Sequence, residues 1–192
     1  MSTSRMEAFT DGVVAILITI MVLEFHAPEG VTWQALRPII PTFLAYLLSF
    51  VFVGIYWANH HHMLQLAERV NGVILWANLN LLFWLSLIPF ATAWMGDNYK
   101  ASIPTALYGI VLLLCGVAYF VLARALVREQ GPHSKLALAF GRDRKGLLSV
   151  STYAVAIAVA FFNPTGSQLL YIAVALMWLV PDPRVEKLGR GS

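Results

Sequence analysis

The sequence predicts an all-α integral membrane protein with six transmembrane helices and both termini in the cytoplasm. Three observations support this fold class: a strongly apolar composition, six long apolar runs, and an uneven distribution of basic residues between them. Of the 192 residues, 59% are hydrophobic and 12% are charged, whereas soluble domains are about 45–50% apolar and about 25% charged. The lipid bilayer is therefore the expected environment.

The composition also excludes several other classes. The net charge of +3 is explained by the loops of a membrane protein, so we expect no nucleic-acid partner. Cys115 is the single cysteine, which excludes an intramolecular disulfide and a C-x-x-C metal site. The first apolar run contains Asp11 and ends without a small-residue cleavage site, so it does not resemble a removable signal peptide.

A helix needs about 20 mostly apolar residues to cross a bilayer. The last two runs are short and are joined by "NPTGS", so a re-entrant hairpin is the alternative to two complete spans. Residues 1–187 are interpreted as one transmembrane domain of six helices, and residues 188–192 as a flexible end or a remnant of cloning. The predicted helices are residues 6–25, 35–57, 71–95, 102–126, 146–162 and 165–181.

The basic residues support this count. With a cytoplasmic N-terminus, the inside segments hold eleven of the 13 Lys and Arg residues, and the outside loops hold only Arg37 and Lys100. This asymmetry follows the positive-inside rule, and an odd number of spans would place a basic segment outside.

The first helix has an aliphatic stripe formed by Ile16, Thr19, Ile20 and Leu23, at helical spacing. Spacing alone favours a face that packs against lipid or a neighbouring helix, because every transmembrane helix has apolar stripes. Thr19 can satisfy its hydroxyl by bonding its own backbone four residues back. Glu24, at the outer end, is expected to reach the interface or to line a mouth that concentrates cations.

Charged residues at the inner end of this helix need partners. A carboxylate at membrane depth, such as Asp11, costs a few kcal/mol unless it is paired or hydrated. Arg5 and Asp11 lie about 120° apart around the helix, so each is expected to find a partner on another helix. "YWANHHH", residues 56–62, is predicted to end the second helix on the same side. Protonated His60 or His61 is one candidate partner for Asp11, and the Trp57 indole N–H is another.

Three consecutive histidines also raise the alternative of a metal or haem site at His60–His62. Adjacent helix side chains diverge by about 100°, and no acid or histidine follows at the required spacing, so a hydrogen-bond network is favoured. In the third helix, Asn78 and Asn80 are expected to bond across helices, and Pro89 to kink or loosen the helix.

Three motifs resemble the transmembrane protein 175 family of potassium channels. "R-M-E-A-F-T-D" at 5–11 is similar to the R-x-x-x-F-S-D signature of the first helix, with Thr10 in place of serine. "W-A-N-H-H" at 57–61 and "P-F-A-T" at 89–92 recur at these places in bacterial members. The motifs cover the first half of the chain, and the predicted topology covers all of it.

The resemblance implies a potassium-selective channel, not an enzyme, that works as a homotetramer in the cell membrane, as in the bacterial single-repeat branch. Potassium ions would permeate, and no cofactor is expected. The first helices would line a central pore narrowed by aliphatic layers at Ile16, Ile20 and Leu23, with Thr19 at a position implicated in selectivity. The remaining signature residues would belong to an inter-helix network: Arg5, Phe9, Thr10, Asp11, Trp57, His60 and His61.

A hydrophobic constriction of this kind gates by resisting wetting, and we expect modest selectivity over sodium because no T-V-G-Y-G filter is present. A small secondary transporter is the other alternative. It predicts a discontinuous helix at mid-membrane, for which only Pro89 is a hint, and usually an ionisable relay, which the last three predicted helices lack.

Overall fold

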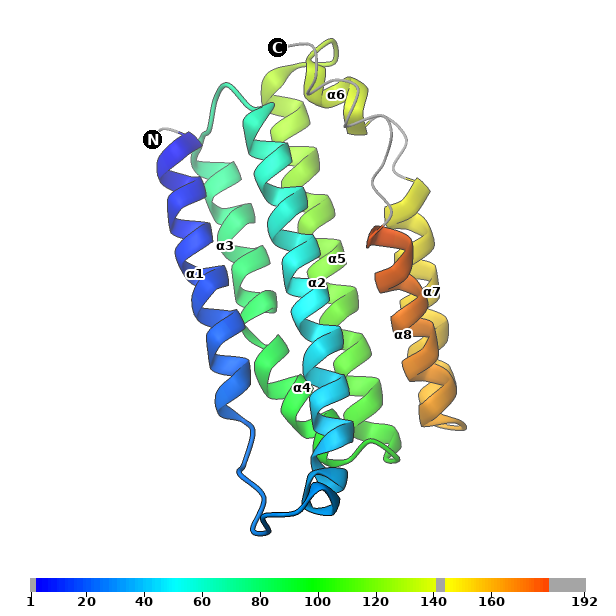
Figure 1. The fold of residues 1–192 in the computed structure, drawn as a ribbon. Coiled ribbons are helices and arrows are strands. Elements are labelled where there is room, and N and C mark those ends of the chain that lie inside the picture. The colour runs from blue at the N-terminus through cyan, green and yellow to red at the C-terminus, as the bar shows by residue number, and fades with distance from the viewer. Residues whose placement is uncertain (1–2, 141–143, 180–192) are drawn as a thin grey trace.

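The structure is a computed structural model that describes residues 3–140 and 144–179 (Figure 1). Within these residues the chain is helical and contains no strand. The predicted tail at 188–192 and the C-terminal end of the chain lie outside the described residues. The elements are α1 (Thr3–Leu23), the 3₁₀ helix η1 (Trp33–Ile39), α2 (Ile40–Gln65), α3 (Gly72–Ser86), α4 (Ile88–Asp97), α5 (Ser102–Gln130), α6 (Lys135–Phe140), α7 (Arg144–Ala160) and α8 (Pro164–Leu179).

The long helices form one bundle with α1 at one side and the α7–α8 pair at the other (Figure 1). α1 packs against α2, α3 and α4, whereas α7 packs against α5 and α8. Large side chains, including Phe52, Tyr108 and Tyr171, are fully buried between these layers. In lipid such close packing, rather than the hydrophobic effect, holds helices together.

In the described part of the chain, four helical stretches are long and apolar enough to cross a membrane: Thr3–Leu23, Trp33–Gln65, Gly72–Asp97 and Ser102–Gln130. They correspond to the first four predicted spans. The last two predicted spans correspond to shorter apolar helices, Lys145–Ala160 and Pro164–Leu179. A helix of 16 residues extends for about 24 Å, less than the roughly 30 Å of a bilayer core. The six-span topology therefore remains a prediction.

The third predicted helix is broken, as its proline indicates. Leu87 separates α3 from α4, and its N–H bonds to the Trp84 carbonyl three residues back at 3.2 Å. Pro89 follows in the first turn of α4 and has no N–H to continue the helical bonding of α3.

The second helix does not end where the sequence predicts. α2 continues to Gln65 instead of stopping at residue 57, so the three histidines lie within its last turns. The segment between 127 and 145, expected to be a loop, contains the end of α5 and the short helix α6. Gly131 ends α5 with a φ of 89°, and Ser134 accepts a hydrogen bond from the N–H of Ala137, which caps α6.

Close packing of α8 on α5 depends on Gly109. A Cβ atom at this position would overlap the Tyr171 hydroxyl and lie 2.9 Å from Ile157 Cγ1. Tyr171 donates a hydrogen bond to the Thr105 carbonyl at 3.0 Å.

We expect Gly109→Ala to displace Tyr171 and to lower the free energy of unfolding by about 1–3 kcal/mol, measured as a lower melting temperature in detergent. Gly54→Ala is the control, because nothing lies within 4 Å of a Cβ there; equal melting of the two variants would contradict this account.

Candidate functional site

The first helix has two distinct faces. Its buried side chains recur every three or four residues and pack against the bundle. The buried set is Met6, Thr10, Val14, Leu17 and Met21.

The aliphatic stripe predicted from the sequence lies on the other face. Ile16 is 56% exposed, Ile20 39% and Leu23 76%. Phe9 is exposed on the same side, and a Cβ added at Gly12 would meet no atom within 4 Å. Within one copy, no helix among the described residues therefore packs against this face of α1.

Thr19 lies on the exposed side and bonds its own helix. Its hydroxyl donates to the carbonyls of Ala15 at 3.1 Å and Ile16 at 2.9 Å, as its position predicts. Because the hydroxyl hydrogen is used in this way, the lone pairs of the Thr19 oxygen remain available to a ligand outside the helix.

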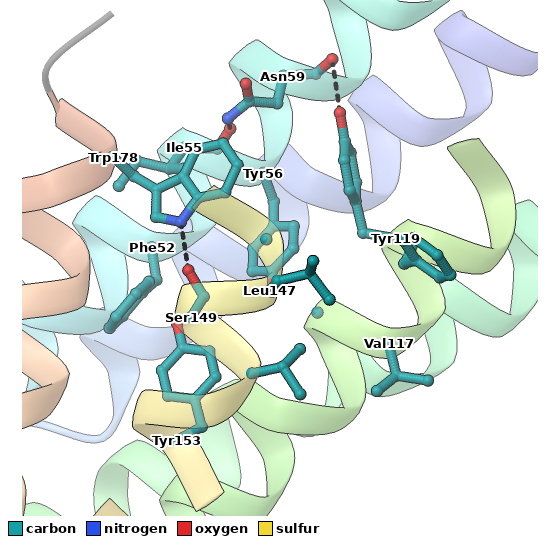
Figure 2. Close-up of a pocket in the computed structure, with 14 residues that line it drawn as sticks. Phe52, Ile55, Tyr56, Asn59, Val117, Tyr119, Leu147, Ser149, Tyr153 and Trp178 are labelled. Carbon is teal, nitrogen blue, oxygen red and sulfur yellow. Dashed lines mark hydrogen bonds between the residues drawn. The ribbon is translucent and has the colours of Figure 1, made fainter. Parts of the chain in front are cut away.

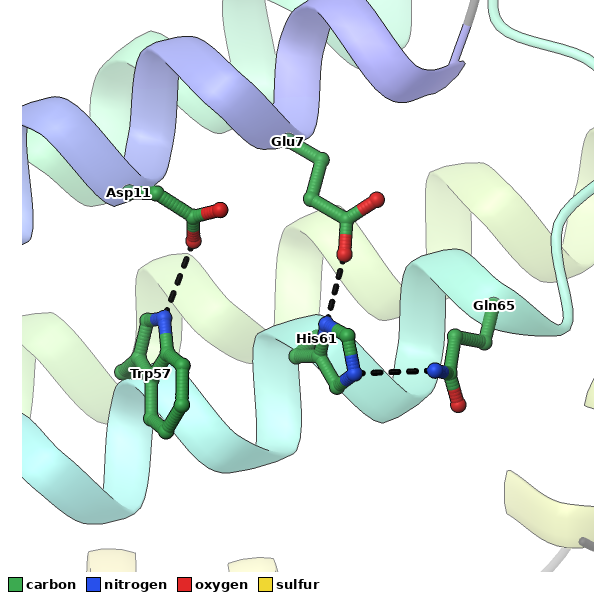
Figure 3. A network of polar contacts seen from close by, with 5 residues as sticks. All are labelled: Glu7, Asp11, Trp57, His61 and Gln65. Atoms are coloured by element: carbon green, nitrogen blue, oxygen red, sulfur yellow. Dashed lines mark hydrogen bonds and ion pairs between the residues drawn. The ribbon is translucent and has the colours of Figure 1, made fainter.

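Two hydrogen bonds join the inner end of α1 to α2 (Figure 3). We call the four residues that form them the α1–α2 ladder: Glu7, Asp11, Trp57 and His61. Trp57 donates through Nε1 to Asp11 Oδ1 at 2.9 Å, which confirms one of the two predicted partners of Asp11. His61 Nδ1 lies 2.6 Å from Glu7 Oε1. On both helices the two residues are four positions apart, so both pairs form along one seam between the helices.

The predicted pairing of Asp11 with a histidine is wrong. His61 bonds Glu7, which the sequence analysis did not single out, and its Nε2 also lies 2.8 Å from Gln65 Nε2. With Gln65 donating to Nε2, His61 donates its Nδ1–H to the Glu7 carboxylate. The signal that could have identified Glu7 is its spacing of four residues from Asp11, which matches the spacing of His61 from Trp57.

A second, buried chain of hydrogen bonds connects three helices. His60 Nε2 lies 2.8 Å from Asn78 Oδ1 on α3, and Asn78 Nδ2 donates to Thr10 Oγ1 on α1 at 3.0 Å. All three side chains are buried. Asn78 therefore bonds across helices, as predicted, and it is the hydrogen-bond partner of both Thr10 and His60.

Other predicted site residues lie apart from these contacts. Arg5 is exposed and makes no hydrogen bond or ion pair to any residue that the structure describes, so its predicted partner on another helix is not present within one copy. Glu24 is exposed just beyond the outer end of α1. Asn80 is exposed on α3.

The histidines do not form a ligand set. His60 faces Asn78, His61 faces Glu7, and His62 is exposed. Among the described residues, no group of three or more His, Cys, Asp or Glu side chains is placed to hold a metal ion. This arrangement gives no support to the metal or haem alternative.

Removing the amide of Asn78 should weaken the bundle. Asn78→Leu leaves the buried Thr10 hydroxyl and His60 imidazole without their partner, so we expect a loss of about 1–2 kcal/mol. Unfolding of purified protein in a denaturing detergent series measures this loss. Asn80→Leu is the matched control, because it makes the same change at an exposed position of the same helix. A loss no larger than that of the control would show that the buried chain contributes nothing to stability.

Known proteins are similar to this chain in sequence and in fold. A family model described as the endosomal/lysosomal potassium channel TMEM175 matches residues 5–89, which include every residue of the ladder and the buried chain. A potassium channel from Chryseobacterium sp. is 52% identical over 187 residues, which cover 97% of each chain. A potassium channel from Streptomyces collinus is 32% identical over 134 residues, covering 66% of this chain and 65% of the relative.

The fold matches the crystal structure of a lysosomal potassium-selective channel TMEM175 homolog from Chamaesiphon minutus with a TM-score of 0.82. That match has 25% sequence identity and covers 93% of this chain and 96% of the other. Nearly full-length similarity at 52% identity, together with the family match over the site, leads to one conclusion. This chain is a multi-pass membrane protein that belongs to the TMEM175 family.

Proposed function

We propose that this chain is a potassium channel, not an enzyme, in which the α1 helices of four identical copies surround a central pore. The observation that carries the proposal is the pair of faces on α1: one is bound to the bundle by polar contacts, and the other exposes an aliphatic stripe. The potassium channels among its relatives support the choice of ion. The proposed location is the cell membrane, which in a bacterium with two membranes is the inner one.

A pore on α1 requires several copies because one helix cannot enclose a path. Identical subunits usually assemble with closed rotational symmetry, which places the same face of each copy on the axis. We propose four copies from the resemblance to the bacterial branch of the family. Arg5, exposed at the inner end of the same helix, would then find its partner on a neighbouring copy.

The constriction would consist of stacked rings of Ile16, Ile20 and Leu23. Along a helix these residues are separated by about 6 and 4.5 Å, so three successive rings form a short apolar section. Such a section, when narrow, excludes water and blocks ions until a small widening allows it to wet. A tilt or rotation of α1 would supply that widening.

Selectivity would come from the residues beside these rings. Potassium loses its hydration water at a lower free-energy cost than sodium because its charge density is lower. The outward lone pairs of Thr19 would replace part of the lost shell. Glu24 at the outer end would raise the local concentration of cations. These effects together favour potassium modestly.

The two alternatives differ from a channel in what they require. A secondary transporter would saturate with substrate and move ions slowly, whereas a wetted pore would not. The break between α3 and α4 is its one structural hint, and Pro89 accounts for that break. A metal or haem enzyme would need His60–His62 to converge, and these side chains have different partners.

The constriction is tested by Ile20→Asn. A polar ring should wet the apolar section, so we expect potassium flux into liposomes to rise severalfold and the preference for potassium over sodium to fall. Ile110→Asn is the matched control, because Ile110 is 39% exposed like Ile20 but lies on α5, away from the proposed pore. Flux and ion preference that are unchanged in Ile20→Asn, or changed equally in both variants, would contradict a pore on α1.

The assembly is tested by the mass of the purified protein. We expect a particle of four chains in mild detergent and a cross-linking ladder that ends at four. Leu23→Cys should form disulfides between copies on oxidation because this position would face the axis, while native Cys115 is buried and should remain unreacted. A protein that stays monomeric in both detergent and lipid would overturn the proposed pore.

A further inference from the structure

A cavity of about 250 Å³ lies between α2, α5, α7 and α8 (Figure 2). Its walls include Phe52 from α2, Gly116 from α5, Tyr153 from α7 and Trp178 from α8. The walls are almost entirely apolar, and none of the lining residues is an Asp or Glu. Sites for drug-sized ligands have volumes of roughly 300–1,000 Å³. At about 250 Å³ this cavity is smaller, and its volume suits part of a flexible chain.

The cavity opens on the outer surface of the bundle. Three of its lining residues are exposed at that surface: Val117, Phe120 and, most of all, Leu147 at 68%. This surface belongs to the side of the molecule where α7 and α8 lie, opposite to α1 (Figure 1). With the pore axis beyond α1, the mouth of the cavity faces lipid.

Two cations lie next to the cavity. The Arg124 guanidinium lies over the ring of Phe120, with Cζ 4.8 Å from the ring centroid. The Lys145 ammonium lies 5.8 Å from the centroid of the Trp178 ring and 3.4 Å from the Met177 carbonyl. Phe120 and Trp178 both line the cavity, so each cation is separated from it by one lining side chain.

The charges and the apolar walls are ordered along the membrane normal. Arg124 follows Phe120 by four residues, or about 6 Å, toward the end of α5 that the sequence predicts to be cytoplasmic. Lys145 lies at the first turn of α7, beside lining residues Gly146 and Leu147. An apolar slot below a pair of cations on the cytoplasmic side matches the two parts of an anionic lipid.

Tyr153 provides a further feature. Its side chain is 3% exposed, and its hydroxyl makes no hydrogen bond to any residue in the described part of the chain. A hydroxyl without a partner among these residues can donate a hydrogen bond to an oxygen of a ligand in the cavity.

We propose that this cavity binds one acyl chain of an anionic phospholipid whose phosphate is held by Arg124 and Lys145. A zwitterionic lipid would fill the same slot but would gain less from the two cations. The proposal rests on the membrane location of the chain and on the proposed pore lying at α1, on the other side of the molecule. It does not depend on which ions the pore conducts, so it can fail while the proposed pore stands.

The test titrates the delipidated full-length protein with phosphatidylglycerol or with phosphatidylcholine of the same chains, and counts bound lipid by native mass spectrometry. We expect wild type to prefer phosphatidylglycerol. Arg124→Gln combined with Lys145→Gln should lower its affinity about 30-fold, since a basic residue contributes about 1 kcal/mol to binding of anionic lipid. The matched control is Lys100→Gln, because Lys100 also lies over an aromatic ring, that of Tyr99, in the loop before α5. Equal affinity for the two lipids, or no loss in the double variant, would overturn the proposal.

A second variant tests the slot itself. A Cβ at Gly116 would lie 3.7 Å from the Tyr56 hydroxyl, so a larger side chain fits only by filling the cavity. Gly116→Leu should weaken binding of both lipids, while Gly72→Leu, at an exposed glycine with open space around it, should weaken neither. Unchanged melting establishes that each variant is folded. Displacement of lipid by glycerol 3-phosphate alone, or a change of oligomer mass in Gly116→Leu without loss of lipid, would show a different occupant and overturn the proposal.

Discussion

The α1–α2 ladder determines which face of α1 is presented outside the bundle. In lipid an apolar helix gains little from burying one apolar face instead of another, because the lipid chains are as apolar as its own residues. Polar side chains break this equivalence, since a carboxylate in an apolar environment requires a hydrogen-bond donor. Trp57 and His61 supply donors to Asp11 and Glu7 at a single rotation of α1. The outward position of Ile16, Ile20 and Leu23 follows from that rotation.

The buried chain from Thr10 through Asn78 to His60 adds a second restraint. The ladder joins α1 to α2, and this chain joins α1 to α3 and α3 to α2, so the three helices are connected in a triangle. A rotation of α1 alone would break both sets of bonds. A movement of α1 that widens the proposed constriction should therefore carry α2 and α3 with it. The alternative is that α1 exchanges these partners for others, such as the neighbouring copy that Arg5 would contact.

Local patterns in the sequence predict the features that depend on local physics. Apolar runs predict the helices, Pro89 predicts the break between α3 and α4, and Thr19 bonds its own backbone as a threonine in a helix does. Features that depend on the register between helices were not predicted: the pairing of Glu7 with His61, the continuation of α2 to Gln65, and the cavity formed by four separate helices. Asp11 had two possible types of partner in the sequence, and only the relative position of α1 and α2 selects Trp57.

Exposure of an aliphatic stripe does not by itself distinguish a pore from a lipid contact. An isoleucine side chain is stable against lipid, so its exposure on one copy fits both cases. The residues around the stripe are what favour the proposed pore. The same side of α1 carries Arg5 near one end, Thr19 in the middle and exposed Glu24 beyond the other end. In the proposed pore these groups would be hydrated, and the aliphatic residues between them would form the section where water is excluded.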